Sequence, residues 1–275
     1  MRKLPIGITK LRIRFLNFLD FFLHKEDFDK EKLKRLEQNS RKYEEWMRND
    51  WELRAKKNPF YFIRTEKNQS DEEFWKSGYN DRNSILEHKP IKEKLDQKFD
   101  EFKVLEIGCG IGRILIPMSE KFQEAVGIDI SQEMVNIGKQ KMENISNCKI
   151  LLNNGIDLSD LTSNYFDFCY SFIVFQHIPE KQIVKNYIKE VGRVLKPNSF
   201  FHFQVRGKHT IDPIKLRLLE NMDEKESAYK ENTWLGVQFS SQEIHKIAEE
   251  FGFEIIDESG ENTEYYWITF CLKEK

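Results

Sequence analysis

The residues best suited to bind a ligand lie in the run Lys-Val-Leu-Glu-Ile-Gly-Cys-Gly-Ile-Gly-Arg at positions 103–113. Gly108, Gly110 and Gly112 alternate there, and an acid, Glu106, precedes them. Apolar residues of strand type come before the glycines and apolar residues at helical spacing follow, which predicts a tight turn between a strand and a helix. Glycine permits positive φ and close approach of a ligand, and a helix N-terminus presents unpaired N–H groups. We therefore predict a ligand that contacts the main chain of this turn.

A second acid, Asp129, ends the next predicted strand, at residues 125–129. A carboxylate at the carboxyl end of that strand can accept hydrogen bonds from both hydroxyls of a ribose. The glycines do not have the Gly-x-Gly-x-x-Gly spacing of dinucleotide-binding proteins, which disfavours an NAD-dependent oxidoreductase. A nucleoside-containing ligand other than a dinucleotide fits both features.

The order Glu-x-Gly-x-Gly-x-Gly resembles motif I of the class I S-adenosylmethionine (SAM)-dependent methyltransferases, and the resemblance extends over residues 102–275 through four motifs in the family order. It implies an α/β fold with a Rossmann-like, seven-stranded, mostly parallel sheet that ends in an antiparallel C-terminal strand. It also implies an enzyme that uses SAM as its cofactor. The residues that it implies for SAM binding are Glu106, Gly108, Cys109, Gly110, Gly112, Asp129, Ile130, Asn154, Gly155, Ser171 and Phe172.

Within that set, Asn154 occupies the position where the family usually has Asp, whose side chain receives the adenine amino group. Asn keeps an acceptor oxygen but no charge, so the resemblance implies a weaker contact there. Gly155 is expected to donate its backbone N–H to the adenine ring. Ser171 and Phe172 follow the fourth predicted strand and are expected to flank the methionine part of SAM.

The methyl acceptor is expected beside the segment after that strand. His177 is the candidate general base because its pKa suits proton transfer near neutral pH, with local packing as the alternative. The predicted substrate contacts are Gln176, Trp75, Tyr79 and Trp234. The many aromatic residues between positions 46 and 79 favour core packing, and some of them could also cover the site.

The predicted function is methyl transfer from SAM to O or N of a small molecule or glycan intermediate, by in-line displacement. The alternative is a non-catalytic SAM-binding module whose N-terminal helix binds a membrane or a partner. Residues 1–95 are predicted to form a helical extension and cap, and residues 96–275 the methyltransferase domain with an insertion at about 207–238. Charges in helical order over residues 26–58 favour a solvated spacer.

Composition limits the partners. Charged residues make up 33% of the chain with a net charge of -2, so nucleic acid is not an expected partner. The four cysteines lack metal-ligand spacing, so we expect no metal, free thiols and a cytoplasmic location. Residues 8–24 alternate basic and bulky apolar groups, which leaves docking or self-association and peripheral membrane contact both open.

Overall fold

The computed structural model describes residues 42–66, 69–95, 98–208 and 236–274. Residues 8–24, Trp234 and nearly all of the predicted insertion lie outside the described residues. From Tyr43 to Lys275 the chain forms one compact unit. The described helices before residue 95 therefore belong to the same unit as the sheet, although the sequence predicted a boundary between residues 95 and 96.

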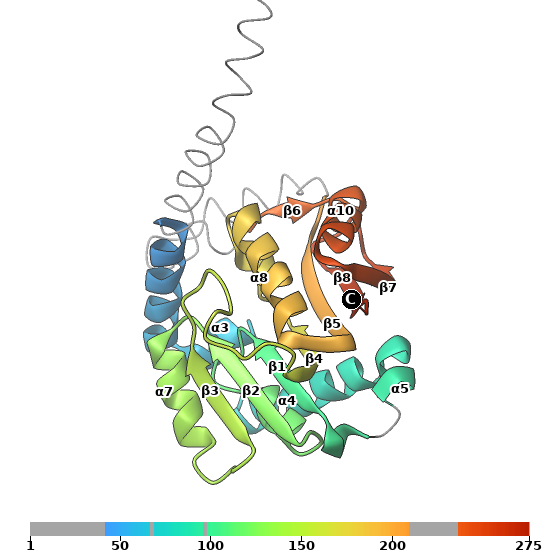
Figure 1. The fold of residues 1–275 in the computed structure, drawn as a ribbon. Helices are drawn as coiled ribbons and strands as arrows, with labels where there is room; N and C mark the ends of the chain where they lie inside the picture. The colour runs from blue at the N-terminus through green and yellow to red at the C-terminus, as the bar shows by residue number, and fades with distance from the viewer. Residues whose placement is uncertain (1–41, 67–68, 96–97, 209–235, 275) are drawn as a thin grey trace, which may run out of the picture. The chain divides into compact units, whose positions relative to one another are not determined.

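The described sheet has eight strands, of which seven follow the order β3-β2-β1-β4-β5-β8-β7 and the short β6 pairs only with β5 (Figure 1). Strand β8 runs antiparallel to β5 and β7, whereas the remaining pairs are parallel, as the sequence predicted. The turn between β7 and β8 is too short for a parallel crossover, which explains the reversal. The strands are β1 (Lys103–Ile107), β2 (Glu124–Asp129), β3 (Cys148–Leu152), β4 (Phe166–Ser171), β5 (Leu195–Gly207), β6 (Gln238–Phe239), β7 (Phe253–Ser259) and β8 (Tyr266–Leu272).

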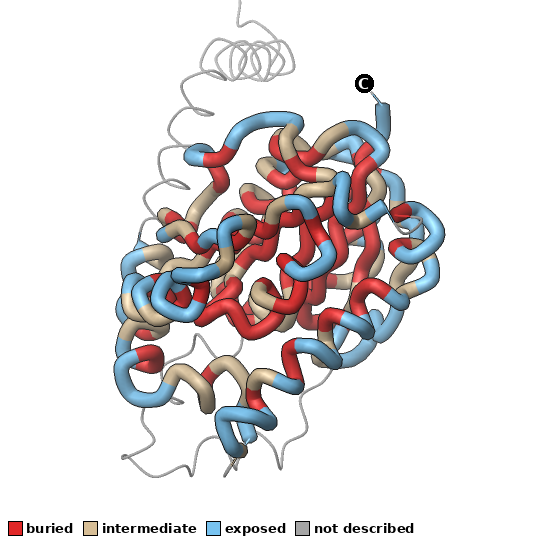
Figure 2. The backbone as a smooth tube through the Cα atoms, turned by 90° about the horizontal axis from the view of Figure 1, so that it is seen from below, coloured by how far each residue is buried: buried red, intermediate tan, exposed pale blue. Residues whose placement is uncertain are grey.

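Helices cover both faces of the sheet. The helices α4 (Asp71–Glu87), α5 (Lys89–Leu95), α6 (Leu115–Ser119) and α7 (Gln132–Lys141) contribute to one core, and α8 (Lys181–Val194) and α10 (Ser241–Phe251) to the other. The central strands are buried on both sides and contribute many apolar side chains to the two cores. Figure 2 shows the buried stretches concentrated in the middle of the molecule. The other described elements are a helix over residues 42–57, α3 (Pro59–Ile63), η1 (Phe99–Glu101) and η2 (Phe175–His177).

Local sequence explains where several elements begin and end. Helix α8 buries Ile183, Tyr187 and Val191, which recur every four residues and so share one face. Helix α10 begins with a capping box between Ser240 and Glu243 and ends at Gly252, whose φ is 77°. Asn198 has a φ of 63°, as predicted for the turn that precedes the inner part of β5.

Helix α4 packs directly on the segment that follows the alternating glycines. A Cβ atom added to Gly78 would lie 1.9 Å from the carbonyl oxygen of Arg113. Next to this contact, the Arg113 guanidinium donates to Ser77 Oγ at 2.9 Å and pairs with Asp81 at 2.5 Å. Gly78 is therefore required for the close approach of the cap to the glycine turn.

We expect Gly78→Ala to lower the free energy of unfolding by about 1–3 kcal/mol, because the new methyl group collides with backbone that cannot move independently. Helix propensity alone predicts the opposite sign, a gain of up to about 1 kcal/mol. Chemical denaturation measures the difference. Lys76→Ala, at an exposed position of the same helix, is the control and should change stability little. Stabilisation by Gly78→Ala would show that α4 does not pack this closely.

Candidate active site

A cavity of about 560 Å³ lies at the carboxyl ends of β1, β2 and β4, where ligands bind in open α/β sheets. The helix over residues 42–57, α3, the segment after β3, the end of β5 and the turn between β7 and β8 also contribute to its lining. Its volume is in the range of small-molecule sites. The predicted site residues that line it are Glu106, Gly108, Cys109, Gly110, Asp129, Ile130, Gly155, Phe172, Gln176 and His177.

The glycine turn is held by its own N–H groups. Gly108 and Cys109 donate to the Ile128 carbonyl at 2.8 and 3.0 Å, and Gly110 donates to Asp129 Oδ2 at 2.8 Å. Gly108 and Gly110 have positive φ values of 74° and 55°. The turn therefore offers a ligand close approach to backbone, while these particular N–H groups are already used inside the protein.

Gly112 lies outside the cavity lining, in contrast to its predicted role. A Cβ atom there would meet Met142 Cε at 2.2 Å, and the Gly112 N–H donates to the Cys109 carbonyl at 2.9 Å. Helix α6 begins only at Leu115, so the helix N-terminus is farther from the glycines than the sequence predicted. Gly112 therefore packs against Met142 and against Ile150 of β3 and does not contact the cavity.

Asp129 ends β2 and lines the cavity with a fixed carboxylate. Besides the Gly110 contact, its Oδ1 accepts from the Ser131 N–H at 2.9 Å. Burial raises the pKa of Asp129, and the hydrogen bonds from Ser131, Gly110 and Ile130 act against that shift. Each carboxylate oxygen has a second lone pair, so the residue can still accept the two hydroxyls of a ribose.

Glu106 is a buried acid, 3% exposed, next to the glycine turn. Burial raises its pKa to about 8, against the hydrogen bond that Tyr170 Oη donates to Glu106 Oε2 at 2.8 Å. The carboxyl group is therefore mostly protonated near neutral pH in the free protein. A bound cation, such as the ammonium group of SAM, would favour its ionised form.

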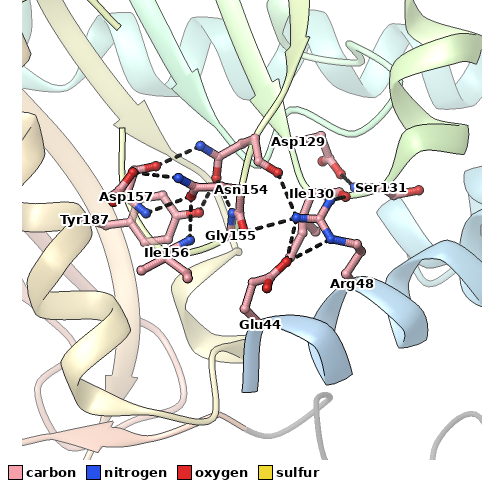
Figure 3. A network of polar contacts seen from close by, with 11 residues as sticks. Glu44, Arg48, Asp129, Ile130, Ser131, Asn154, Gly155, Ile156, Asp157 and Tyr187 are labelled. Atoms are coloured by element: carbon pink, nitrogen blue, oxygen red, sulfur yellow. Dashed lines mark hydrogen bonds and ion pairs between the residues drawn. The ribbon is translucent and has the colours of Figure 1, made fainter. Parts of the chain in front are cut away.

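Arg48 connects the helix over residues 42–57 to the ends of β2 and β3 (Figure 3). Its guanidinium donates to the carbonyls of Ile130 and Asn154, both at 3.0 Å, and to Glu44 Oε1. Glu52 of the same helix accepts from the Glu133 N–H at 3.0 Å at the start of α7. This helix is thus part of the site, and the prediction that residues 26–58 form a solvated spacer is wrong for its described part.

The turn after β3 differs from the predicted adenine contacts. Asn154 Oδ1 accepts from the N–H groups of Ile156 and Asp157, at 2.8 and 3.0 Å, so the side chain faces its own turn and lies outside the cavity lining. Gly155 lines the cavity, but its N–H donates to Asn153 Oδ1 at 2.9 Å. Neither group offers an adenine ring the free contact that was predicted. Asn153, which sequence reasoning missed, lines the cavity instead.

The segment after β4 brings the acceptor-side residues to the cavity. Gln204 Nε2 donates to Gln176 Oε1 at 3.0 Å, which leaves the Gln176 amide N–H groups to face His177 Nε2 at 3.1 Å. When Gln176 donates to His177 Nε2, the neutral imidazole carries its proton on Nδ1. The Nε2 lone pair is then already used in a hydrogen bond. Ser171 is outside the lining because its Oγ donates to the Ile107 carbonyl within the sheet, at 3.2 Å.

The aromatic cover of the cavity consists of other residues than predicted. Trp51 and Phe62 line it, and Trp51 packs edge-on against His177 with ring centroids 5.4 Å apart. Trp75 packs against Phe74 outside the cavity, at 5.2 Å between centroids. Tyr79 points to the α6 side, where its hydroxyl donates to Glu120 at 2.6 Å. Any of these aromatic side chains could pack in a core or line the cavity, so their residue types do not tell which ones do. Their positions in the folded chain decide it.

Three more lining residues were missed in the sequence. Arg206 lies near the end of β5, and Glu264 and Tyr265 lie in the turn before β8. The position of Arg206 near the carboxyl end of a parallel strand is a signal that could have identified it. No group of three or more His, Cys, Asp or Glu side chains within the described ranges is placed to hold a metal ion. Likewise, none of the described helices has the length and apolar character of a membrane span.

The sheet order with β8 reversed, the alternating-glycine turn after β1 and the acid at the end of β2 are those of the class I SAM-dependent methyltransferases. The residues fit SAM: Asp129 suits a ribose, Glu106 suits an ammonium group, and the cavity has the size of a small-molecule site. The fold and the site thus resemble those of the class I SAM-dependent methyltransferases, and the site residues fit SAM.

Comparisons with known proteins agree with this class. Residues 104–198 match the family model described as a methyltransferase domain. The chain is 32% identical over 114 residues to the putative methyltransferase YqeM of Bacillus subtilis, covering 40% of this chain and 44% of the relative. It is 32% identical over 98 residues to a demethylmenaquinone methyltransferase of Staphylococcus carnosus, covering 34% and 39%. A third match is the sterol 4-C-methyltransferase strm-1 of Caenorhabditis elegans, with 30% identity over 117 residues, covering 42% and 34%. The chain thus spans less than half the length of these relatives.

Solved structures show the same fold. Magnesium protoporphyrin IX methyltransferase from Synechocystis PCC 6803, with bound S-adenosylhomocysteine (SAH), superposes with a TM-score of 0.55 at 17% identity, covering 82% of this chain and 98% of that one. Geranyl diphosphate C-methyltransferase from Streptomyces coelicolor A3(2) gives 0.52 at 10% identity, covering 74% and 85%. At these identities the likeness concerns the fold alone.

Proposed function

We propose that the chain transfers the methyl group of SAM to O or N of a small molecule or glycan intermediate by in-line displacement. One observation carries the proposal: the residues suited to SAM and the polar residues suited to an acceptor line the same cavity. Asp129 and Glu106 belong to the first group, and Gln176, His177 and Arg206 to the second. A donor and an acceptor bound there would be neighbours.

SAM supplies an activated sulfonium methyl, so the main task of the chain is alignment. Holding two reactants in line can lower the activation free energy by about 7–11 kcal/mol. The Trp51 and Phe62 side chains cover the cavity and would exclude water from it. Because His177 Nε2 faces Gln176, the arrangement favours an acceptor that is already nucleophilic over one that must lose a proton to His177.

A small-molecule acceptor is supported by the size of the cavity and by the names of the relatives, which refer to menaquinone and sterol methylation. The described free cysteines Cys109, Cys148, Cys169 and Cys271 support the proposed cytoplasmic location, because thiols stay reduced there.

The test is incubation of the chain with ¹³C-methyl-labelled SAM and pools of small molecules, followed by mass spectrometry and carbon NMR of the labelled product. A methyl carbon shift typical of methoxy or N-methyl groups supports the proposal. A C-methyl shift would keep methyl transfer and overturn O or N as the acceptor atom. SAM binding without turnover across all pools would favour the non-catalytic binding module.

A further inference from the structure

Arg206 is a buried cation near the end of β5 whose guanidinium is only partly used. The residue is 4% exposed and lines the cavity. Its Nη1 donates to the Gly236 carbonyl at 2.8 Å. Its Nε and Nη2 are sealed from solvent and have no hydrogen-bond partner in the described part of the chain.

The two unpaired nitrogens make up one edge of the guanidinium. The N–H groups of Nε and Nη2 point in parallel, and this edge binds two oxygens of a carboxylate or phosphate at once. A buried N–H group of a charged side chain that lacks a hydrogen-bond acceptor has lost its hydration without a hydrogen bond to replace it. The chain therefore leaves unpaired the part of Arg206 that is best suited to an anion.

Arg206 keeps its positive charge in this setting. Burial lowers the pKa of Arg206 and the charge of Glu264 acts against that shift, and a guanidinium stays protonated in proteins. Glu264 lines the same cavity and reduces the net positive charge there. Arg113 also lines the cavity, but it pairs with Asp81 at 2.5 Å, so its charge is already neutralised.

We propose that Arg206 is a specificity residue that binds an anionic group, a carboxylate or a phosphate, on the methyl acceptor. The proposal rests on the proposed function and narrows its substrate class to small organic acids or phosphorylated molecules. A purely structural role would need only the Nη1 contact with Gly236, which a side chain with one donor could also make.

The experiment measures binding of four aromatic probes to the full chain saturated with SAH, by calorimetry. Benzoate and phenyl phosphate carry the two anionic groups, and benzamide and benzyl alcohol are their neutral counterparts. The variants are Arg206→Gln and Arg206→Lys. Lys208→Gln is the matched control, because it removes an exposed positive charge two residues away, outside the cavity lining. SAH affinity and thermal stability are recorded for every protein.

We expect one anionic probe to bind more tightly than its neutral counterpart, and the identity of that probe distinguishes carboxylate from phosphate. Arg206→Gln should weaken it about 100-fold and Arg206→Lys about tenfold, since Lys keeps the charge but lacks the bidentate edge. Lys208→Gln should change it less than about twofold.

Three outcomes would overturn the anion site: equal binding of anionic and neutral probes by the wild-type chain, unchanged binding in Arg206→Gln, or an equal loss in Lys208→Gln. The first is decided on the wild-type chain, so it holds even if the Arg206 variants fold poorly. Failure of the wild-type chain to bind SAH would instead refute the proposed function.

Discussion

Asp129→Ala is expected to weaken SAM binding by about 100-fold or more. The carboxylate would lose two charge-assisted hydrogen bonds to the ribose, each of about 1.5–3 kcal/mol. The substitution also removes the acceptor that holds the Gly110 N–H at 2.8 Å, so the glycine turn loses a fixed point. Asp129→Asn keeps one acceptor oxygen and should lose less. Isothermal titration calorimetry with SAM measures each affinity.

Asp160→Ala is the control for the loss of an acid, because Asp160 is exposed and lies outside the cavity lining. It should bind SAM as the wild-type chain does. Undiminished SAM binding by Asp129→Ala would refute the ribose assignment. A loss of the same size in Asp160→Ala would mean that general charge, rather than contact, controls binding.

Glu106→Gln is expected to remove much of the pH dependence of SAM binding between pH 6 and 8. In the free protein burial raises the pKa of Glu106 to about 8, so below that pH the carboxyl group must lose a proton to pair with the cationic ligand. The wild-type affinity should fall by up to about tenfold per pH unit below 8, whereas Gln has no proton to release. SAM has the same titrating groups in both experiments. The difference between the two proteins in the pH dependence of SAM affinity therefore reports on Glu106 alone.

Glu106→Gln should also change how the stability of the ligand-free chain depends on pH. Wild-type SAM affinity is expected to rise with pH, whereas wild-type stability is expected to fall. A carboxyl whose folded pKa is raised from 4.5 to about 8 contributes stability that is fully present below 4.5 and is lost as pH rises through 8. The ligand-free Glu106→Gln chain should therefore gain stability relative to wild type as pH rises from 5 to 8, by at most about 1.4 kcal/mol per unit. Tyr170 keeps an acceptor in this variant, since Gln retains an oxygen.

Thermal unfolding of both ligand-free proteins across this pH range gives the stability difference, and calorimetry in buffers of different ionisation enthalpy gives the protons released on SAM binding. Glu143→Gln, at an exposed position, is the control and should follow wild type in both measurements. Parallel pH curves for wild type and Glu106→Gln would show that Glu106 is already ionised in the free protein.

The features that the sequence predicted correctly depend on short-range chemistry. The alternating glycines predicted positive φ because glycine adopts it at no steric cost, and Gly108 and Gly110 have it. Asp129 lies at the end of its strand in the cavity because the carboxyl ends of parallel strands meet at one edge. The reversed β8 followed from the length of one turn. SAM binding by these residues stays a prediction that the variants above test.

The residue types alone do not tell which aromatic and polar side chains line the cavity. The sequence predicted Trp75 as a substrate contact, yet Trp51 lines the cavity and Trp75 packs against Phe74 outside it. Asn154 matched the family position, but hydrogen bonds to its own turn occupy its side chain.

The sequence by itself therefore predicted the resemblance to methyltransferases, the glycine turn and the positions of Glu106 and Asp129, because these depend on neighbouring residues and on where strands end. Only the tertiary structure decided the cover of the cavity and the unpaired edge of Arg206, because both depend on contacts between segments far apart in the chain. Whether a buried guanidinium finds a partner is a property of everything packed around it, and no local pattern encodes that.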